Sequence, residues 1–480
     1  MSITILGLGP GNPEHLTREA WALWEGATEV YLRTERHPTV AGLPAHLQVH
    51  SFDRLYEEME TFEAVYAAIT ERVLALGQRP QGVLYAVPGH PWVGEATTAR
   101  IVAQAQVGGQ AVRVVEGLSF LEPAWTALGL DPLSGLQLVD ALDLARQHHP
   151  QVVLEQPVLV GQLYSRWLAS EVKLTLMACY PDDHPVMLVQ ALSTPTAQVR
   201  SLPLYELDRQ ADLDHLSSLL VPPLGRPGSL LALQEVVAHL RAPEGCPWDR
   251  EQTHRSLRPE MMEELYEALQ ALDEGDEEKL REELGDLLLE ACLQMQIAAD
   301  EGEFLPPEVV SGVVEKLVRR HPHVFGGEEV SGPGQVLRNW EESKRLERGD
   351  RGYADMLNGV PTALPALAQC QAYQKRVARV GPSVPLEGAL ALWLQGLVSA
   401  GPTDGPGQRE AWLGQALFGL AGLAQRWGVD AESVLREANR AFAHEFHQAA
   451  DAVERGEAQW SGVTWHGLLP DQQAWADREA

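Results

Sequence analysis

The chain has 480 residues and 45% hydrophobic content, which is enough for about two to four domains with ordinary apolar cores. Its formal charge of −30 argues against a nucleic-acid backbone or an anionic membrane as the main partner, and a polyanionic substrate would need a cation beside it. The four cysteines form no CxxC pair, and no segment reaches membrane-spanning length or resembles a secretory signal, so we expect reduced thiols and a cytoplasmic protein.

Residues 1–206 alternate short apolar runs with helical stretches, which predicts an α/β domain. Two glycine-containing turns follow apolar runs, GLGPGN after ITIL and PGHP after LYAV. Glycine permits tight turns and close backbone approach, and ligands of open α/β sheets bind at strand ends that lead into helices. The turn residues that we expect to contact a ligand are Gly7, Gly9, Gly11, Pro88, Gly89 and His90.

A linker is predicted at residues 207–229, where VPPLGRPGS carries three prolines and two glycines. From residue 230 onward the apolar residues recur with helical spacing and almost no strand alternation remains, which predicts an all-α region. We expect its first part to span residues 230–350 and a second part to span residues 360–455.

The most informative helical stretch covers residues 260–291, where carboxylates occur in the patterns EExxE and ExxD. Residues three or four apart share one face of a helix, and on that basis these carboxylates flank two apolar stripes. We therefore expect the carboxylates to lie close to buried side chains. The first stripe is Met261, Leu265, Ala268, Leu269 and Leu272, and the second is Leu280, Leu284, Leu287, Leu288, Ala291 and Met295. The flanking carboxylates are Glu264, Glu267, Glu283 and Asp286, with Glu263 further round.

A short connection at residues 273–279 predicts that the two helices form an antiparallel pair, which can bring EExxE opposite ExxD. Clustered anions in a partly dry site repel one another unless they bind protons or a cation. Oxygen ligands without His or Cys favour Mg²⁺ or Mn²⁺ over Zn²⁺. For Glu277, Glu278 and Glu282 a solvated charged face is the better interpretation.

The second helical part resembles the first but lacks its acids. LGQALFGLAGLAQ at residues 413–425 aligns with LGDLLLEACLQ at residues 284–294, so that Trp412 replaces Glu283 and Gln415 replaces Asp286. Trp and Gln cannot reproduce a carboxylate metal site, so we expect this degenerate copy to be structural, completing a bundle or a dimer.

These segments resemble two known families. CPWDREQTHRSL, MMEELYEAL, REELGDLLLEA, KLVRRHPHVFGG and NWEESKR resemble the MazG-type nucleoside triphosphate pyrophosphohydrolases over about residues 230–455. GLGPGNPEHLT, YAVPGHPWVGE and VVEGLSFLEPAWTALGL resemble the tetrapyrrole (corrin/porphyrin) methylases, which use S-adenosylmethionine. The whole chain is therefore similar to the YabN-type fusion of the two families.

The resemblance implies Mg²⁺-dependent hydrolysis of a nucleoside triphosphate to its monophosphate and pyrophosphate. Metal would be held by Glu264, Glu267, Glu283 and Asp286, and Glu263 is a candidate for a second metal or for orienting water. Phosphate charge should also meet basic side chains, and a base could stack on an aromatic ring. The expected substrate-binding residues are Trp248, Lys316, Arg319, Arg320 and Lys344, although basic residues at a helix C-terminus also complement its dipole.

For the first domain the resemblance implies an S-adenosylmethionine site, but methylating members commonly carry an acidic residue where this chain has His90. Two alternatives to the hydrolase therefore stay open: S-adenosylmethionine-dependent methyl transfer, or a non-catalytic nucleotide-sensing or assembly module. Helical bundles of this kind often complete their core between chains, so we also expect a homo-oligomer.

Overall fold

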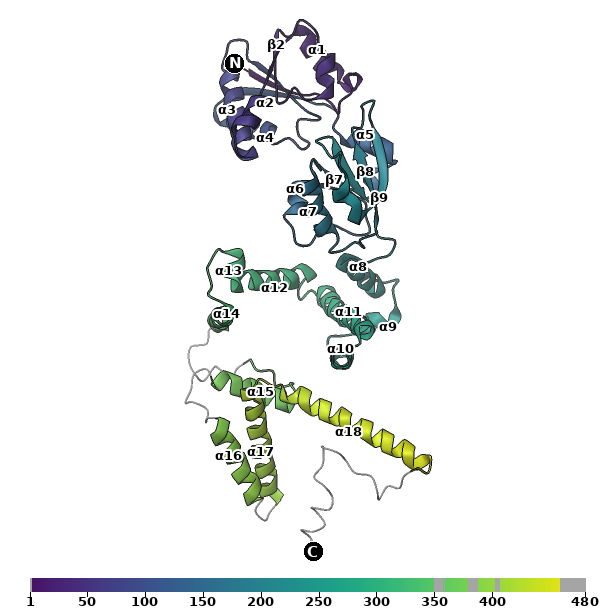
Figure 1. Ribbon diagram of the computed structural model, residues 1–480, viewed down its shortest axis with the longest axis vertical. Coiled ribbons are helices and arrows are strands. Elements are labelled where there is room, and N and C mark those ends of the chain that lie inside the picture. Colours follow the sequence, from purple (N-terminus) through teal and green to yellow (C-terminus); the bar gives the residue numbers. More distant parts are fainter. Residues whose placement is uncertain (1, 349–356, 358, 379–386, 402–405, 458–480) are drawn as a thin grey trace. The chain divides into compact units, whose positions relative to one another are not determined.

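The computed structural model describes residues 2–348, 357, 359–378, 387–401 and 406–457 (Figure 1). Its backbone divides into two compact units, Met1–Val309 and Val310–Ala480. An α/β region followed by helices confirms the predicted fold class. Within the described part of the chain, none of the helices combines the length and the apolar character that a membrane crossing requires.

The first unit opens with a five-stranded parallel sheet in the order β3-β2-β4-β1-β5. Alternate residues of its strands face opposite sides, so Ile3 and Ile5 pack under α3 and α4, while Leu6 packs with Trp24 of α1 on the other side. The strands are β1 (Ser2–Gly7), β2 (Glu29–Leu32), β3 (Gln48–Ser51), β4 (Val83–Val87) and β5 (Ala111–Val115). The helices are α1 (Arg18–Gly26), α2 (Asp53–Glu58), α3 (Phe62–Gly77) and α4 (Ala96–Val107).

A second five-stranded sheet has the order β6-β7-β10-β8-β9 and is antiparallel except for the β6–β7 pair. Its strands are β6 (Gln137–Asp140), β7 (Val158–Gly161), β8 (Pro185–Gln190), β9 (Gln198–Pro203) and β10 (Ser217–Val221). The accompanying helices are α5 (Leu121–Leu128), α6 (Ala141–Ala145) and α7 (Arg166–Leu176). Short 3-10 helices occur at Pro13–His15, Pro38–Gly42, Pro132–Ser134 and Leu204–Arg209.

Strand β10 lies inside the predicted linker of residues 207–229 and is the central strand of this sheet. All five of its residues are buried, so it has no alternation of exposed and buried positions that would mark a strand in the sequence. The sheet therefore continues to Val221, and only residues 222–229 connect it to the first long helix of the helical part.

The first unit then becomes helical, with α8 (Leu230–Arg241), α9 (Pro247–Glu251), α10 (Arg258–Glu274) and α11 (Glu277–Glu301). Helices α8 and α10 both pack on α11. Their shared core contains Val237, Leu257, Leu293 and Ile297, all almost completely buried.

Helix α12 (Pro306–Arg320) spans the boundary between the units, and the second unit continues as helices. These are α13 (Pro322–Phe325), α14 (Pro333–Arg348), α15 (Ala366–Val377), α16 (Glu387–Ala400), α17 (Pro406–Trp427) and α18 (Ala431–Glu454). Helices α15 and α16 both pack on α17, as α8 and α10 pack on α11, which supports the predicted degenerate copy. Trp412, which aligns with Glu283, donates a hydrogen bond to the Leu397 carbonyl over 2.8 Å.

Candidate functional site

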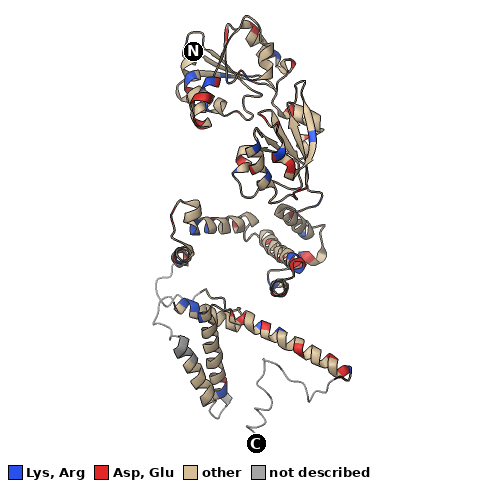
Figure 2. Cartoon of the chain, viewed as in Figure 1, with Lys and Arg blue, Asp and Glu red and all other residues tan. Residues whose placement is uncertain are grey.

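The acidic site lies between α10 and α11, which a tight turn joins as an antiparallel pair. Helix α10 ends at Gly275, whose φ of +67° is the left-handed conformation that favours glycine at this position. Asp276 follows at once and caps α11 by accepting a hydrogen bond from the Lys279 backbone N–H over 3.0 Å. Acidic residues are grouped on these two helices (Figure 2).

Three of the predicted metal ligands lie together. One carboxylate oxygen from each of Glu264, Glu267 and Glu283 lies within 4.8 Å of the others. Glu283 is only 5% exposed. Asp286, one helical turn beyond Glu283, is half-buried and close enough to act electrostatically on Glu264. Glu263 is exposed and lies outside the three-residue group.

The electrostatics of this group favour binding of a cation. Burial raises the pKa of the Glu264 carboxyl, and the negative charges of Asp286, Glu267 and Glu263 raise it further. Burial also raises the pKa of the Glu283 carboxyl, together with the charges of Glu267 and Glu264. A divalent cation among these oxygens would offset the repulsion, and an all-oxygen donor set fits Mg²⁺ or Mn²⁺.

Two further carboxylates extend the site and were missed in the sequence. Glu290 is 7% exposed, and burial together with the charge of Glu260 raises the pKa of its carboxyl. Glu260 and Glu290 each have one oxygen that is buried and has no hydrogen-bond partner among the described residues. The signal was present, because Glu260 precedes Glu264 by four residues and Glu290 follows Asp286 by four, which continues one face of each helix.

The predicted apolar stripes are only partly covered in the described chain. Leu272 is 58% exposed on α10 and Leu284 is 50% exposed on α11, whereas Glu283 beside it is buried. The buried side chains of α10 are Ala268 and Ala271. The expectation that these stripes lie near buried side chains is met in part, because Met295 packs on the buried residues Leu293 and Ile297, whereas Leu272 and Leu284 are exposed.

The predicted basic substrate residues belong to the second unit, where several have acidic or aromatic neighbours. Arg319 and Arg320 of α12 both form ion pairs with Glu347 of α14, at 2.7 Å for Arg319. Hydrogen bonds from Arg320 and Arg319 lower the pKa of the Glu347 carboxyl to about 2. Lys344 places its ammonium 3.5 Å from the ring centre of Trp340, a cation–π contact. Lys316 is exposed on α12.

Trp248 lies on the short helix α9 and is 56% exposed. It is not among the side chains that form the core shared by α8 and α11. Exposure leaves its ring available for stacking, as the predicted substrate contact requires.

The two glycine turns of the α/β region meet directly. Gly9 and Gly89 exchange two backbone hydrogen bonds, N–H to carbonyl, of 3.2 and 3.0 Å. Both have positive φ, +69° and +64°. A Cβ on Gly7 would lie 2.4 Å from the Gly89 carbonyl oxygen, so glycine is required there for the turns to approach.

A cavity of about 750 Å³ opens beside these turns. Gly9, Pro88 and Gly89 line it, whereas Gly7, Gly11 and His90 are outside its lining. His90 instead accepts a hydrogen bond at Nδ1 from the Trp92 backbone N–H over 3.1 Å, so its side chain closes the turn as an Asp side chain could.

The cavity also contains charged side chains that sequence reasoning did not identify. Arg33 lines it and forms an ion pair with the buried Glu95, which in turn caps the start of α4 at Thr97. His37 lines the same cavity, is 7% exposed, and burial lowers the pKa of its imidazole to about 4. No periodicity or glycine pattern marked these residues, since they come from loops and strand ends.

Comparison with known families gives two matches along the chain. Residues 2–208 match the family model of the tetrapyrrole (corrin/porphyrin) methylases. Residues 252–325 match that of the MazG nucleotide pyrophosphohydrolase domain.

Several individual proteins are similar to this chain. YabN of Bacillus subtilis, described as uncharacterized, is 40% identical over 378 residues, which cover 78% of this chain and 76% of YabN. The nucleoside triphosphate pyrophosphohydrolase/pyrophosphatase MazG of Thermotoga maritima is 36% identical over 46% of this chain and 86% of its own length. The solved structure of uroporphyrin-III C-methyltransferase from Thermus thermophilus covers 46% of this chain and 94% of its own, with a TM-score of 0.37 and 22% identity.

Proposed function

Because this chain belongs to the family of proteins that join a tetrapyrrole methylase domain to a MazG nucleotide pyrophosphohydrolase domain, we propose that it hydrolyses nucleoside triphosphates to monophosphate and pyrophosphate. The observation that carries this proposal is the grouping of Glu264, Glu267 and Glu283 within 4.8 Å, next to Asp286. Clustered carboxylates of this kind suit a Mg²⁺-assisted attack on a triphosphate. We further propose that the enzyme is cytoplasmic and removes noncanonical or excess nucleotides.

Each carboxylate has a proposed role. Glu264, Glu267, Glu283 and Asp286 would hold the cation, which when bound neutralises triphosphate charge and makes a neighbouring water more acidic. Glu263, exposed beside Glu264, is the candidate for orienting that water. The water oxygen attacks the α-phosphorus and the water gives up a proton to solvent. The bond from the α-phosphorus to the oxygen shared with the β-phosphorus breaks, and pyrophosphate leaves.

The remaining predicted residues would bind the rest of the substrate. Lys316, Arg319, Arg320 and Lys344 are proposed to contact the phosphates, which requires the two arginines to share or release Glu347. Trp248 is proposed to stack on the base.

The test is release of monophosphate and pyrophosphate from a panel of canonical and modified triphosphates, with Mg²⁺ or with EDTA. We expect release of monophosphate and pyrophosphate with Mg²⁺ and none with EDTA. We also expect Glu264→Gln and Asp286→Asn each to lower kcat at least about 10²-fold. Glu282→Gln is the matched control, since Glu282 is exposed on the same helix and lies outside the acidic group. Undiminished turnover in both site variants would refute the site assignment.

The cavity beside Gly9 and Gly89 supports a second candidate, binding of S-adenosylmethionine, with or without methyl transfer. Equilibrium dialysis with labelled S-adenosylmethionine tests it, with Gly89→Trp as the blocking variant. A Cβ at position 89 would meet only Ser119, at 3.8 Å, but the φ of Gly89 is +64°, so a Trp there is both strained and bulky at the cavity wall. Undetectable binding to the folded wild-type protein would remove this candidate.

A further inference from the structure

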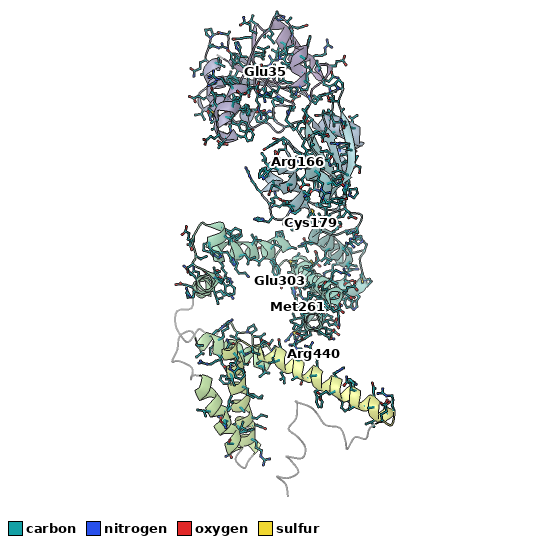
Figure 3. The ribbon with its side chains drawn as sticks, in the orientation of Figure 1. Glu35, Arg166, Cys179, Met261, Glu303 and Arg440 are labelled. Carbon is teal, nitrogen blue, oxygen red and sulfur yellow. The ribbon has the colours of Figure 1, made fainter. Side chains whose placement is uncertain are left out.

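A second group of possible ligands lies at the far end of α11, away from the acidic site along that helix. His254, Glu301 and Glu303 each offer one ligand atom, and the three atoms lie within 4.8 Å of one another. His254 belongs to the loop between α9 and α10, Glu301 ends α11, and Glu303 follows the helix cap. Figure 3 labels Glu303 just beyond the end of α11.

The backbone brings the two carboxylates to one side. Gly302 caps α11 with a φ of +71°, a left-handed conformation that reverses the chain direction. This reversal returns Glu303 beside Glu301, whereas in a continuing helix residues two apart lie on nearly opposite sides. The pairing of these acids therefore depends on the glycine at the helix end.

A glutamine fixes the orientation and the tautomer of the histidine ring. His254 Nδ1 donates a hydrogen bond to the Gln294 side-chain oxygen over 2.5 Å, so Nε2 of the neutral ring carries a lone pair. Gln294 and Glu301 are seven residues apart and share one face of α11. An imidazole fixed through one nitrogen, with the other nitrogen directed at carboxylates, is the usual arrangement around a metal-binding histidine.

When the ring is neutral, no described residue donates a hydrogen bond to that second nitrogen, and only a protonated ring would form an ion pair with Glu303 there. Nε2 is inaccessible to water and has no hydrogen-bond partner among the described residues, although Glu303 Oε2 lies 3.3 Å away. A nitrogen lone pair that faces two carboxylates is repelled unless a proton or a cation lies between them.

The loop that carries His254 is held firmly to α11. The Arg241 side chain is 7% exposed, and its Nε donates to Asp300 over 2.8 Å. The same guanidinium donates to the backbone carbonyls of Asp249 and Gln252. The position of His254 is thus fixed before any ligand binds, which lowers the entropy cost of binding.

We propose that His254, Glu301 and Glu303 form a binding site for a divalent first-row transition metal, with Gln294 orienting the imidazole. One nitrogen and two carboxylate oxygens favour ions such as Zn²⁺ or Mn²⁺ over Mg²⁺ and Ca²⁺. The bound ion ties the loop before α10 to the end of α11 and so stabilises the helix pair. This site is separate from the acidic group and does not depend on the proposed hydrolysis.

Zn²⁺ titration of the metal-free, full-length protein by calorimetry tests the proposal, with excess Mg²⁺ present to occupy the acidic site. We expect one Zn²⁺ per chain that persists in Mg²⁺ and raises the unfolding midpoint. His254→Gln and Glu303→Gln should abolish that binding, and Gln294→Ala should weaken it by about 10- to 100-fold. His239→Gln, which changes an exposed histidine of α8, and Glu264→Gln should retain it.

Equal Zn²⁺ binding by wild type, His254→Gln and Glu303→Gln would overturn the proposal. Loss of the same site in Glu264→Gln would also overturn it, because Zn²⁺ would then be bound at the acidic group. Glu303→Gln leaves the His254–Gln294 contact in place, so it reports on ligation even where His254→Gln fails to fold.

Discussion

Glu290 is a carboxylate that water barely reaches, and it faces other acids rather than a base. Its neighbours include Glu260, Glu264 and Asp286, whose charges add to the effect of burial on its pKa. Such a group destabilises the protein without a cation and becomes tolerable once positive charge is supplied. Stability and metal binding are therefore coupled at single residues of this site.

The first prediction concerns Glu290→Gln. Without metal we expect the unfolding midpoint of the helical part to rise by about 2 °C, roughly 0.5–1 kcal/mol, because an unpaired buried charge is removed. Excess Mg²⁺ should reduce this rise in the unfolding midpoint, because bound cation offsets the charge of Glu290 in the wild-type protein. Scanning calorimetry in EDTA and in Mg²⁺ measures both effects, with the exposed Glu278→Gln as control. A lower midpoint in EDTA would mean that the Glu290 carboxylate has a stabilising partner.

The second prediction concerns Glu347, which forms ion pairs with Arg319 and Arg320, two residues proposed to bind the substrate phosphates. Glu347→Gln should lower KM for the triphosphate by about three- to tenfold, because Arg319 and Arg320 are released, and Arg320→Gln should raise it. Steady-state kinetics measure the change. Glu437→Gln removes a comparable ion pair, with Arg440 on α18, and should leave KM unchanged. An unchanged KM in both Glu347→Gln and Arg320→Gln would exclude these arginines from substrate binding.

At the scale of elements, the end of the connection between the second sheet and α8 is held by the side chain of Glu155. Glu155 accepts hydrogen bonds from the backbone N–H groups of Gly228 and Ser229, over 2.9 and 3.0 Å, and from the Ser229 hydroxyl over 2.8 Å. Ser229 is also the N-cap of α8. These bonds, led by the Gly228 N–H, lower the pKa of the Glu155 carboxyl from 4.5 to about 2.

The third prediction is a pH dependence that follows from this shift. A carboxyl with a lowered pKa in the folded state stabilises above its ordinary pKa and loses that contribution as pH falls from about 4.5 toward about 2. Glu155→Gln should therefore lower the unfolding midpoint at neutral pH, and its difference from wild type should shrink on acidification. Thermal melts followed by circular dichroism across this range measure it, with exposed Glu71→Gln as control. A pH-independent difference would contradict the assignment.

The sequence predicted the types of secondary structure and the acidic residues that lie together, but not every domain boundary or every side chain that lines a site. Helical spacing placed Glu264 and Glu283 on facing helices because such periodicity is local. Strand β10 was not predicted because a completely buried strand lacks alternation. Arg33 and His37 were not predicted because they line the cavity only in the folded structure. Part of the apolar face of α10 and of α11 is exposed, because periodicity identifies an apolar face but not what covers it.

At the scale of the molecule, the exposed apolar residues of α10, α11 and α12 need an explanation. Leu284 and Leu288 on α11 are 50% and 45% exposed. On α12, Val310 is 54% exposed, and the described helix has no buried residue. Exposed apolar faces of this extent commonly mark protein interfaces.

The fourth prediction is therefore a homo-oligomer that forms through these helices. We expect a mass above that of one 52.7 kDa chain in light scattering coupled to size exclusion, and a single-chain mass for the double variant Leu284→Glu, Leu288→Glu. Leu133→Glu is the control, because Leu133 is 95% exposed in the α/β part. A wild-type protein that is monomeric at micromolar concentration would contradict the expectation.

The order of strands in the first sheet also governs how the protein is made. β1 begins at Ser2 but pairs with β4 and β5. Ile3 can pair with Val83, and Ser2 with Ala111, only after those later residues have been synthesised. At a synthesis rate of roughly 5–20 residues per second, the first strand leaves the ribosome about 5–20 s before its partners exist. During that interval its apolar side chains are available to chaperones, and the glycine turns that form the cavity wall can meet only after β4 has emerged.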